Sequence, residues 1–300
     1  MSYALYHQIQ YQPNLKLTVQ KLVTDWDEGK IIYIGLVFFM MLINWTIEAS
    51  KWRLLLIGTE KISLGQSLLS VLTGLAISII TPNRVGEYMG RILYLRNNHK
   101  LQGITVTIIG SFAQLIVTGF FGMIGLVYYI TFIVQHIWLY ILLFSSIFLC
   151  LFLGYFYFNL KQILEWSAKF SFLKKIITYL EIVRQFDKRQ LVKILMFSFF
   201  RYAIYTIQFL LLFKLLLVEA PILDLLFTVW VIFWAMAILP TIAIAEVGIR
   251  GETALFFLSP ICMNSLGIVS STILLWLINL IIPALIGSLY IFKMKIYEDE

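Results

Sequence analysis

Residues 81–87 read Thr-Pro-Asn-Arg-Val-Gly-Glu and follow directly on an apolar run from Leu64 to Ile80. A stretch of the same kind begins at Pro240, at the end of an apolar run from Leu223, and reaches Glu-Val-Gly-Ile-Arg-Gly-Glu at residues 246–252. Helix breakers and ionisable side chains are each disfavoured in hydrocarbon. Finding both together, twice, at the ends of apolar runs predicts a polar site that the protein itself lines.

The composition of the chain is that of an integral membrane protein. Of its 300 residues, 61% are hydrophobic and only 13% are charged, and the mean hydropathy is +0.90. These values lie far outside the range of soluble domains. Apolar segments of about 17 to 25 residues recur, and at about 1.5 Å per residue each can cross about 30 Å of hydrocarbon as a helix. We therefore expect an all-α polytopic membrane protein.

Five long apolar segments and two short ones follow one another along the chain. The long ones lie near residues 31–55, 104–130, 137–158, 194–217 and 266–291, and the short ones are 64–80 and 223–239. Each short segment is at the lower limit for crossing a bilayer and ends close to a proline. We predict five to seven transmembrane helices, in which the short segments either cross or re-enter as proline-broken hairpins. The membrane domain, residues 31–291, lies between a polar N-terminal segment (1–30) and a polar tail (292–300).

The two broken segments occupy matching places in two stretches of the chain. Residues 31–130 and 191–291 each contain a span, a broken hairpin and a span, and residues 137–158 form a linking span. Paired interrupted segments of this kind mark the central site of transporters built from inverted repeats. We therefore predict an inverted repeat. The excess of Lys and Arg on the cytoplasmic side is nearly the same whether the short segments cross or re-enter, so both topologies stay open.

Residues 160–193 form the one long hydrophilic connection between apolar segments. Basic side chains alternate there with apolar ones at roughly helical spacing. This pattern fits an amphipathic helix on an anionic leaflet, and it fits a solvated cytoplasmic connector equally well.

Several kinds of site lack support in the sequence. Cys150 and Cys262 lie in apolar surroundings without CxxC spacing, and the three histidines stand apart, so we expect no metal and no cofactor. Basic residues are not gathered with solvent-facing aromatic residues, which argues against nucleic acid as a partner. We also find no nucleophile with its base, no Walker loop and no dinucleotide fingerprint, and we do not expect an enzyme.

Charged side chains at the two breaks are the candidate substrate-binding residues. Three arginines could hold a phosphate through paired N–H bonds, namely Arg84, Arg91 and Arg250. Three glutamates could balance them or meet a cationic headgroup, namely Glu87, Glu246 and Glu252. The alternative is that these charges form neutral salt bridges that lock the hairpins.

The helix breakers are the second component of each site. Proline removes a backbone donor and disfavours helix in the residue before it, which applies to Pro82 and Pro240. Glycine lets the backbone turn or approach another group closely, which we expect at Gly86, Gly248 and Gly251.

Further candidates lie near the end of the first long segment. Asn44 and Glu48 are one helical turn apart and should face the same cavity, whereas Lys51 and Trp52 are expected to anchor the helix at the membrane interface. Arg201, inside the segment 194–217, needs a partner in the membrane. We expect that partner to be Glu246 or Glu252.

Three motifs resemble the transmembrane region of the lysylphosphatidylglycerol synthase and flippase family. They are Lys-Trp-Arg at 51–53, the break at 81–87, and Pro240 followed by residues 246–252. The resemblance spans approximately residues 31–291. It implies a multi-pass protein of the bacterial inner membrane that moves lipids between leaflets. We expect no synthase domain after residue 300, and therefore no lysyl transfer.

The resemblance turns the expected ligand from any anion into a lipid headgroup. We expect a phospholipid or lipid-linked headgroup, in the first place that of an anionic phospholipid, to enter between the hairpins, with Arg84 and Arg250 on the phosphate and Glu87 and Glu252 balancing or gating. The alternative is a non-catalytic scaffold or accessory subunit that docks a lipid- or glycan-modifying enzyme on residues 160–193. An intramembrane transferase that depends on Glu87 or Glu252 is a third hypothesis.

Overall fold

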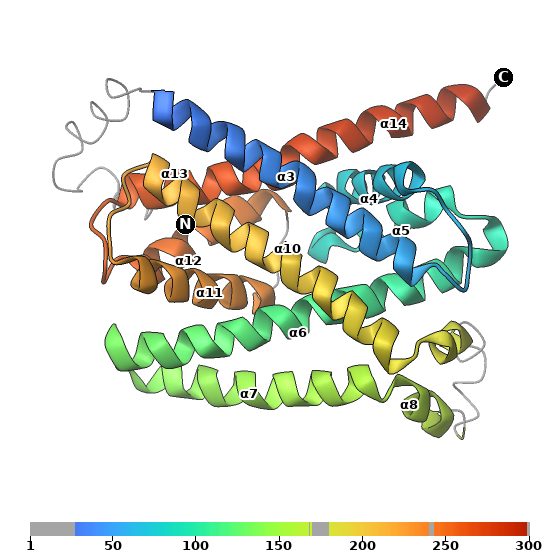
Figure 1. The fold of residues 1–300 in the computed structure, drawn as a ribbon, viewed down its shortest axis with the longest axis horizontal. Helices are drawn as coiled ribbons and strands as arrows, with labels where there is room; N and C mark the ends of the chain where they lie inside the picture. Colours follow the sequence, from blue (N-terminus) through green and yellow to red (C-terminus); the bar gives the residue numbers. More distant parts are fainter. Residues whose placement is uncertain (1–27, 168, 170–179, 240–242, 299–300) are drawn as a thin grey trace. The chain divides into compact units, whose positions relative to one another are not determined.

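The computed structural model describes residues 28–167, 169, 180–239 and 243–298 of the chain, and their regular secondary structure is helical throughout (Figure 1). The expectation of an all-α polytopic membrane protein is confirmed. In hydrocarbon a helix satisfies its own backbone hydrogen bonds, which is why apolar runs of this length fold in this way.

Within the described residues, five helices are long and apolar enough to cross a membrane. Four of them are continuous: α3 (Glu28–Leu55), α6 (Lys100–Phe132), α7 (Ile137–Phe158) and α10 (Lys188–Leu215). The fifth consists of α13 (Ser265–Trp276), a π-helical turn η6 (Leu277–Ile281) and α14 (Ile282–Glu298). These helices contain four of the five long segments predicted from the sequence, and α10 covers the remaining one, 194–217, except for its last two residues.

The two short apolar segments also form helices, and each is followed by a second short helix. The first pair is α4 (Leu64–Ile79) and α5 (Gly86–Arg91), and the second is α11 (Ile222–Ile238) and α12 (Ala243–Leu258). The partners within each pair pack against each other, so both pairs are helical hairpins. Re-entry of these hairpins into a membrane remains a prediction.

The break between α4 and α5 follows from the local sequence. A capping box starts α4, in which the Ser63 hydroxyl accepts from the Gln66 N–H at 3.2 Å and the Gln66 side chain accepts from the Ser63 N–H at 3.0 Å. The helix stops before Thr81, whose extended backbone (φ −115°, ψ 139°) is the conformation that a following proline favours. A 3₁₀ turn at Pro82–Arg84 then leads into α5, so Pro82 acts as predicted.

The second break differs from the prediction in one respect. Pro240 lies outside the described residues, but Gly248 and Gly251 both lie inside α12. They therefore do not turn the chain, because a helix accommodates glycine at a cost of about 1 kcal/mol without losing its hydrogen bonds. The break precedes residue 243, and the charged residues 246–252 belong to the helix that follows it.

The chain divides into two compact units that do not coincide with the predicted repeats. The first contains Met1–Ile43, Thr118–Ser146 and Ala203–Ile282, and the second contains Asn44–Val117, Ile147–Tyr202 and Pro283–Glu300. Long helices contribute residues to both units. The hairpin α4–α5 belongs to the second unit and the hairpin α11–α12 to the first. The inverted relation between the two halves remains a prediction.

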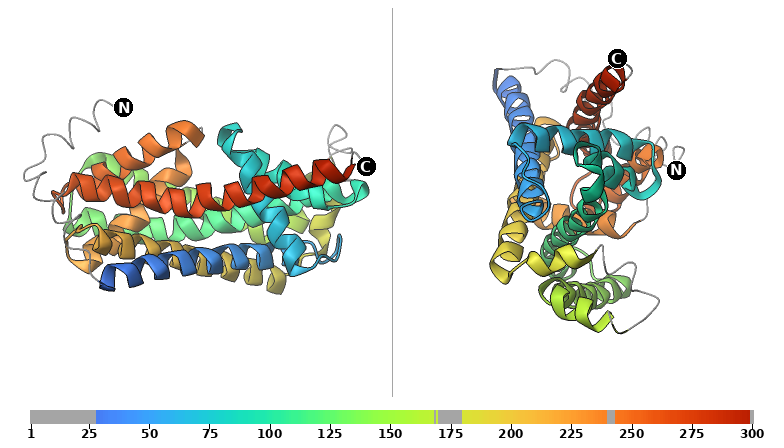
Figure 2. Two further views of the ribbon diagram at one scale, coloured as in Figure 1. Left: turned by 90° about the horizontal axis from the view of Figure 1, so that it is seen from above. Right: turned by 90° about the vertical axis from the view of Figure 1, so that its right-hand side faces the viewer.

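Packing in the first unit joins the hairpin α11–α12 to α13, which lies beside it (Figures 1 and 2). Trp234 on α11 is fully buried, and its indole N–H donates to the hydroxyl of Ser146 at 2.6 Å. Asn264 begins α13 by accepting from the Gly267 N–H at 2.9 Å. Its amide also donates to the carbonyls of Leu216 and Leu217, which fastens the end of α10 to the start of α13.

Packing in the second unit depends on backbone contact between α4 and α5. A Cβ added to Gly90 would lie 2.4 Å from the Cα of Gly74 and 2.8 Å from the carbonyl oxygen of Thr73. At Gly86 an added Cβ would lie 2.6 Å from the carbonyl oxygen of Ile77. These glycines serve the close approach predicted for Gly86, and neither has a positive φ.

The basic connection 160–193 is partly helical. It contains α8 (Leu160–Ser167), where Leu164 is buried, and a 3₁₀ turn at Glu181–Gln185. Helix α10 starts at Lys188, so residues 188–193 belong to a long apolar helix and not to the connection. Residue 168 and residues 170–179 lie outside the described part of the chain.

We predict that Gly90→Ala destabilises the protein, because the new methyl group meets backbone atoms of α4 that cannot rotate away. Overpacking of this kind costs about 1–3 kcal/mol. The expected result is a lower midpoint of thermal unfolding in detergent. Gly65→Ala is the control, since an added Cβ there meets nothing within 4 Å and alanine favours helix. Equal midpoints for the two variants would contradict the backbone contact.

Candidate anion-binding site

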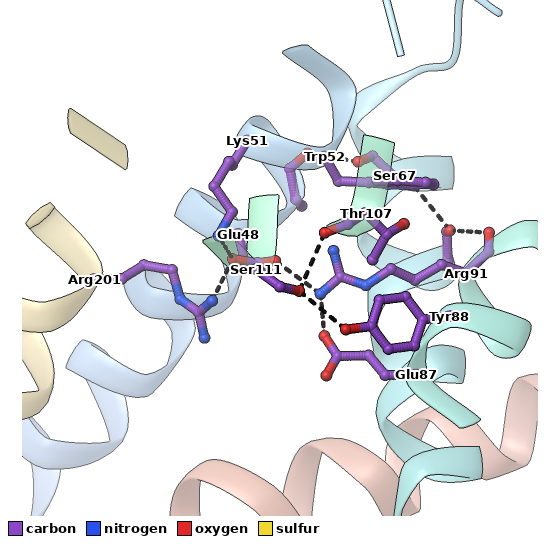
Figure 3. Close-up of polar contacts among 12 residues, drawn as sticks. Glu48, Lys51, Trp52, Ser67, Glu87, Tyr88, Arg91, Thr107, Ser111 and Arg201 are labelled. Carbon is purple, nitrogen blue, oxygen red and sulfur yellow. Dashed lines mark hydrogen bonds and ion pairs between the residues drawn. The ribbon is translucent and has the colours of Figure 1, made fainter. Parts of the chain in front are cut away.

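Glu48 is the centre of a buried group of charges in the second unit (Figure 3). Only 2% of this residue is exposed. Its carboxylate contacts the Lys51 ammonium at 2.8 Å, Nη2 of Arg91 at 2.7 Å, and Nη1 of Arg201. One carboxylate thus faces three cations. We call this group, together with the two further residues in contact with it, the Glu48 cluster: Asn44, Glu48, Lys51, Glu87, Arg91 and Arg201.

Three elements deliver these side chains to one place. Asn44, Glu48 and Lys51 lie on one face of α3, because residues three or four apart on a helix are neighbours. The hairpin helix α5 supplies Glu87 and Arg91, which form an ion pair at the same spacing. Helix α10 supplies Arg201.

Arg201 finds its partners on α3. Its Nε donates to Oδ1 of Asn44 at 2.9 Å, its Nη1 contacts Glu48, and its guanidinium lies 5.4 Å from the ring centre of Trp45. These contacts replace the partner expected from the sequence, which was Glu246 or Glu252. The prediction that Asn44 and Glu48 face one polar site agrees with this arrangement.

Lys51 and Trp52 do not anchor α3 at an interface, contrary to the sequence-based expectation. They are 2% and 0% exposed, respectively. Lys51 turns back to Glu48, and the Trp52 indole N–H donates to the Ser70 hydroxyl at 3.0 Å. The buried carboxylate of Glu48, one turn away, stabilises the Lys51 ammonium better than water at the membrane surface would. The Lys51 side chain therefore does not extend to the interface.

Arg91 is held by contacts of its guanidinium and of its backbone. Its guanidinium bonds Glu48 and Glu87 through Nη2 and lies 5.6 Å from the ring centre of Trp52. Its backbone carbonyl accepts from the Ser70 hydroxyl at 2.6 Å. The side chain is 3% exposed, yet Nε has no hydrogen-bond partner among the described residues. An unsatisfied N–H on a buried cation is costly, so this donor is the one most in need of a ligand.

The charges of the Glu48 cluster do not cancel. Three cations and two carboxylates give 3 − 2 = +1. A buried charge without a counter-charge is strongly destabilising, and a monoanionic ligand would restore neutrality. The cluster is most exposed at Glu87, whose side chain is 29% exposed, compared with 3% for Arg91. The cluster therefore has the charge and the donor of an anion-binding site.

Hydroxyl groups lie beside the guanidinium of Arg91 (Figure 3). The Tyr88 hydroxyl donates to Ser111 at 3.5 Å, the Ser111 hydroxyl donates to the carbonyl of Thr107 at 3.1 Å, and the Thr107 hydroxyl donates to the carbonyl of Gly103 at 2.7 Å. Sequence reasoning missed these three residues. The spacing of two of them could have indicated a polar face, since Thr107 and Ser111 are four residues apart on one face of α6.

The charged residues at the second break belong to the first unit and form an ion pair. Arg250 donates from Nε to Oε1 of Glu246 at 2.9 Å, and its Nη2 contacts the same oxygen. Both residues belong to α12, one turn apart, and Glu246 is 3% exposed. This pair matches the local salt bridge weighed as an alternative in the sequence. Oε1 of Glu252 is buried and has no hydrogen-bond partner among the described residues.

Arg84, the first arginine of the break at 81–87, ends the 3₁₀ turn in a left-handed backbone conformation with φ 57°. For a residue with a side chain this conformation costs about 1 kcal/mol or more. The residue is half-buried. The guanidinium that bonds Glu48 and Glu87 belongs to Arg91, seven positions further along the chain.

No group of three or more metal-ligating side chains occurs in the part of the chain that the structure describes. The Glu48 cluster is itself poor in ligands for a cation, because each carboxylate already faces an arginine. An anion is the ligand that its charges suit.

We predict that Glu48→Gln destabilises the protein by about 3–5 kcal/mol, since it leaves the buried Lys51 and Arg91 and the partly buried Arg201 without their shared counter-charge. Thermal or denaturant unfolding in detergent measures the effect. Arg201→Gln should cost less in the Glu48→Gln background than in the wild type, because the two residues interact directly.

Glu181→Gln, at an exposed position, is the control for the glutamate change and should alter stability little. Additive effects of Glu48→Gln and Arg201→Gln would show that the contact between them contributes nothing.

Comparison with known proteins agrees with the motifs. The family model described as "Lysylphosphatidylglycerol synthase TM region" matches residues 15–287. No curated protein and no solved structure matches the chain significantly. The matched range includes every residue of the Glu48 cluster and of the α11–α12 hairpin. The chain therefore belongs to the family of the lysylphosphatidylglycerol synthase transmembrane region, and it is a multi-pass membrane protein from a family related to lipid metabolism.

Proposed function

We propose that the protein is a lipid translocase of the bacterial inner membrane, and that it binds the phosphate of a lipid headgroup in the Glu48 cluster. The observation that carries the proposal is the buried net charge of +1, combined with the unpartnered Nε of Arg91. The family membership supplies the context of lipid metabolism.

A phosphodiester has the chemistry that this cluster lacks. It carries one negative charge, and its oxygens accept the N–H bonds that guanidinium and ammonium groups supply. Arg91 offers Nε, and Lys51 has three N–H donors of which one contacts Glu48 at 2.8 Å. Binding a phosphodiester would therefore satisfy a buried donor and neutralise the cluster in a single step.

The location of the cluster favours movement of a lipid over chemistry on it. Glu48 and Arg201 lie on α3 and α10, which are long enough to span a membrane, and Arg91 lies on the broken hairpin. Interrupted helices place binding groups near the middle of the bilayer in transporters. The headgroup would cross between such groups while its acyl chains stay in hydrocarbon.

The sequence alone assigned the phosphate to Arg84 and Arg250. We move the assignment to Arg91, Lys51 and Arg201, because these three cations share one buried carboxylate. Arg250 forms an ion pair with Glu246 within its own helix. A joint site made by both breaks remains a sequence-based prediction.

The proposal predicts that Arg91→Lys abolishes transport without unfolding the protein. Lysine keeps the positive charge for Glu48 and Glu87 but lacks the Nε donor and the fork of the guanidinium. The assay reconstitutes the protein in proteoliposomes with a tail-labelled phospholipid and follows its movement between leaflets by chemical quenching of the outer leaflet. We expect the rate to fall at least tenfold, with an unchanged unfolding midpoint.

Three further variants in the same assay separate the alternatives. Arg189→Gln, at an exposed position at the start of α10, is the control and should transport normally. Arg84→Ala and Arg250→Ala test the assignment made from the sequence. Normal transport by Arg91→Lys together with loss in Arg84→Ala and Arg250→Ala would overturn the site proposed here. Absence of transport by the wild type, with a stable enzyme partner copurifying, would support the scaffold hypothesis.

A further inference from the structure

We propose that one end of the second unit is a docking surface that lies in the headgroup region of an anionic membrane leaflet. The surface comprises the described residues of 56–63, 92–100 and 159–193, and we call it the basic face. It shares no residue with the Glu48 cluster. The inference goes beyond the proposed function, since it concerns how the protein contacts the membrane surface and not what it carries.

The two ends of the hairpin α4–α5 meet at this face. Glu60 precedes α4, and its carboxylate accepts from the backbone N–H of Arg96 at 3.1 Å. The same carboxylate lies 3.1 Å from Nδ1 of His99. Both partners follow α5 in the chain, so the hairpin leaves the face and returns to it. Lys61, next to Glu60, and Arg96 are thereby brought to one surface.

The connection between α7 and α10 packs against the same end of the unit. A Cβ added to Gly58, which precedes α4, would overlap the side chain of Gln185 at the end of the 3₁₀ turn. Helix α8 packs against this turn. The Tyr157 hydroxyl, at the end of α7, donates to the Leu191 carbonyl at the start of α10 at 3.0 Å. The three connections therefore lie together at one end of the unit.

The basic face carries a net positive charge. Its described residues include nine Lys or Arg and four Asp or Glu, which gives 9 − 4 = +5, and eight of the nine basic residues are exposed. The first unit differs, because its described connections 133–136, 216–221 and 259–264 contain no Lys or Arg and one Glu. Positive charge is thus concentrated on the connections of the second unit.

Exposed apolar side chains are interspersed with these charges. Trp166 on α8 is 61% exposed, Ile57 is 57% exposed and Leu93 is 41% exposed. Leu164 on the same helix as Trp166 is only 4% exposed, so α8 buries one apolar side chain in the protein and presents the tryptophan to its surroundings. Tryptophan together with Lys and Arg is typical of the membrane–water interface.

An anionic leaflet fits both properties of the basic face. Its phosphates attract Lys and Arg, each of which favours binding about fivefold near the surface. Its headgroup region also accommodates exposed indole and aliphatic side chains, which an acidic soluble protein would accommodate only with a matching apolar patch. The attraction depends on the charge of the leaflet and not on the identity of its headgroups.

A fluorescent reporter on α8 tests this proposal in the full-length protein. Cys150 and Cys262 are replaced by alanine, and the exposed Gln162 is replaced by cysteine and labelled with the environment-sensitive dye NBD. The protein is placed in nanodiscs of phosphatidylcholine alone, or with added phosphatidylserine or phosphatidylglycerol. We expect either anionic lipid to shift the emission to shorter wavelength, because α8 is drawn into the headgroup region. The shift should disappear at about 1 M salt, where the Debye length is about 3 Å.

Matched variants assign the shift to the basic face. Gln135→Cys, in the α6–α7 connection of the first unit, is the control for the label and should emit equally in neutral and anionic nanodiscs. Lys188→Gln combined with Arg189→Gln should at least halve the shift of the dye on α8, since it removes two of the five net charges. Lys214→Gln, at an exposed basic residue of the first unit, should leave the shift unchanged.

The outcomes are independent of the transport assay. Equal emission from α8 in neutral and anionic nanodiscs would overturn the docking surface, whatever Arg91→Lys does to transport. A full shift in the Lys188→Gln, Arg189→Gln protein, or an equal shift at the control position, would overturn the assignment to the basic face. A response to soluble polyglutamate but not to anionic lipid would show that the face binds an acidic protein, and would also overturn the proposal.

Discussion

Compensation of buried charge is the constraint on which the second unit depends. Glu48 gives up hydration on α3, and it is stable there only because cations from α3, α5 and α10 surround it. The same contacts order the hairpin, since Arg91 also fixes its backbone to α4 through Ser70. One carboxylate thus links elements that are separated by 43 and 153 residues in the chain. The excess positive charge that results is the property from which binding of an anion follows.

Much of the fold could be predicted because its determinants are local. Apolar length sets the five long helices, and Pro82 with the extended Thr81 sets the first break. The site could be predicted only in part. Asn44, Glu48, Glu87, Arg91 and Arg201 were recognised as charges or amides that need partners in a membrane. Their pairing was not readable, because it depends on which helix faces meet, and for the same reason Lys51 and Trp52 were misplaced at the interface.

The two breaks show that similar motifs can have different electrostatic outcomes. At the first, Glu87 and Arg91 form a pair that remains joined to a larger network with a charge of +1. At the second, Glu246 and Arg250 form an ion pair one turn apart within α12. Spacing of four residues is common to both pairs, so the difference comes from Glu48, Lys51 and Arg201 and not from the motif. Glycine likewise behaves differently, since Gly86 starts a helix whereas Gly248 and Gly251 continue one.

The π-helical turn Leu277–Ile281 has a consequence for the helix that contains it. A π turn holds one residue more than an α turn, so it shifts the angular phase of all later side chains by about 100° relative to an uninterrupted helix. The shift falls directly before Pro283, where the chain passes from the first compact unit to the second. A single apolar helix can thereby present one stripe to its neighbours before the turn and a rotated stripe after it. In α14 the rotated stripe includes Gly287, where an added Cβ would lie 2.1 Å from the Leu72 carbonyl oxygen.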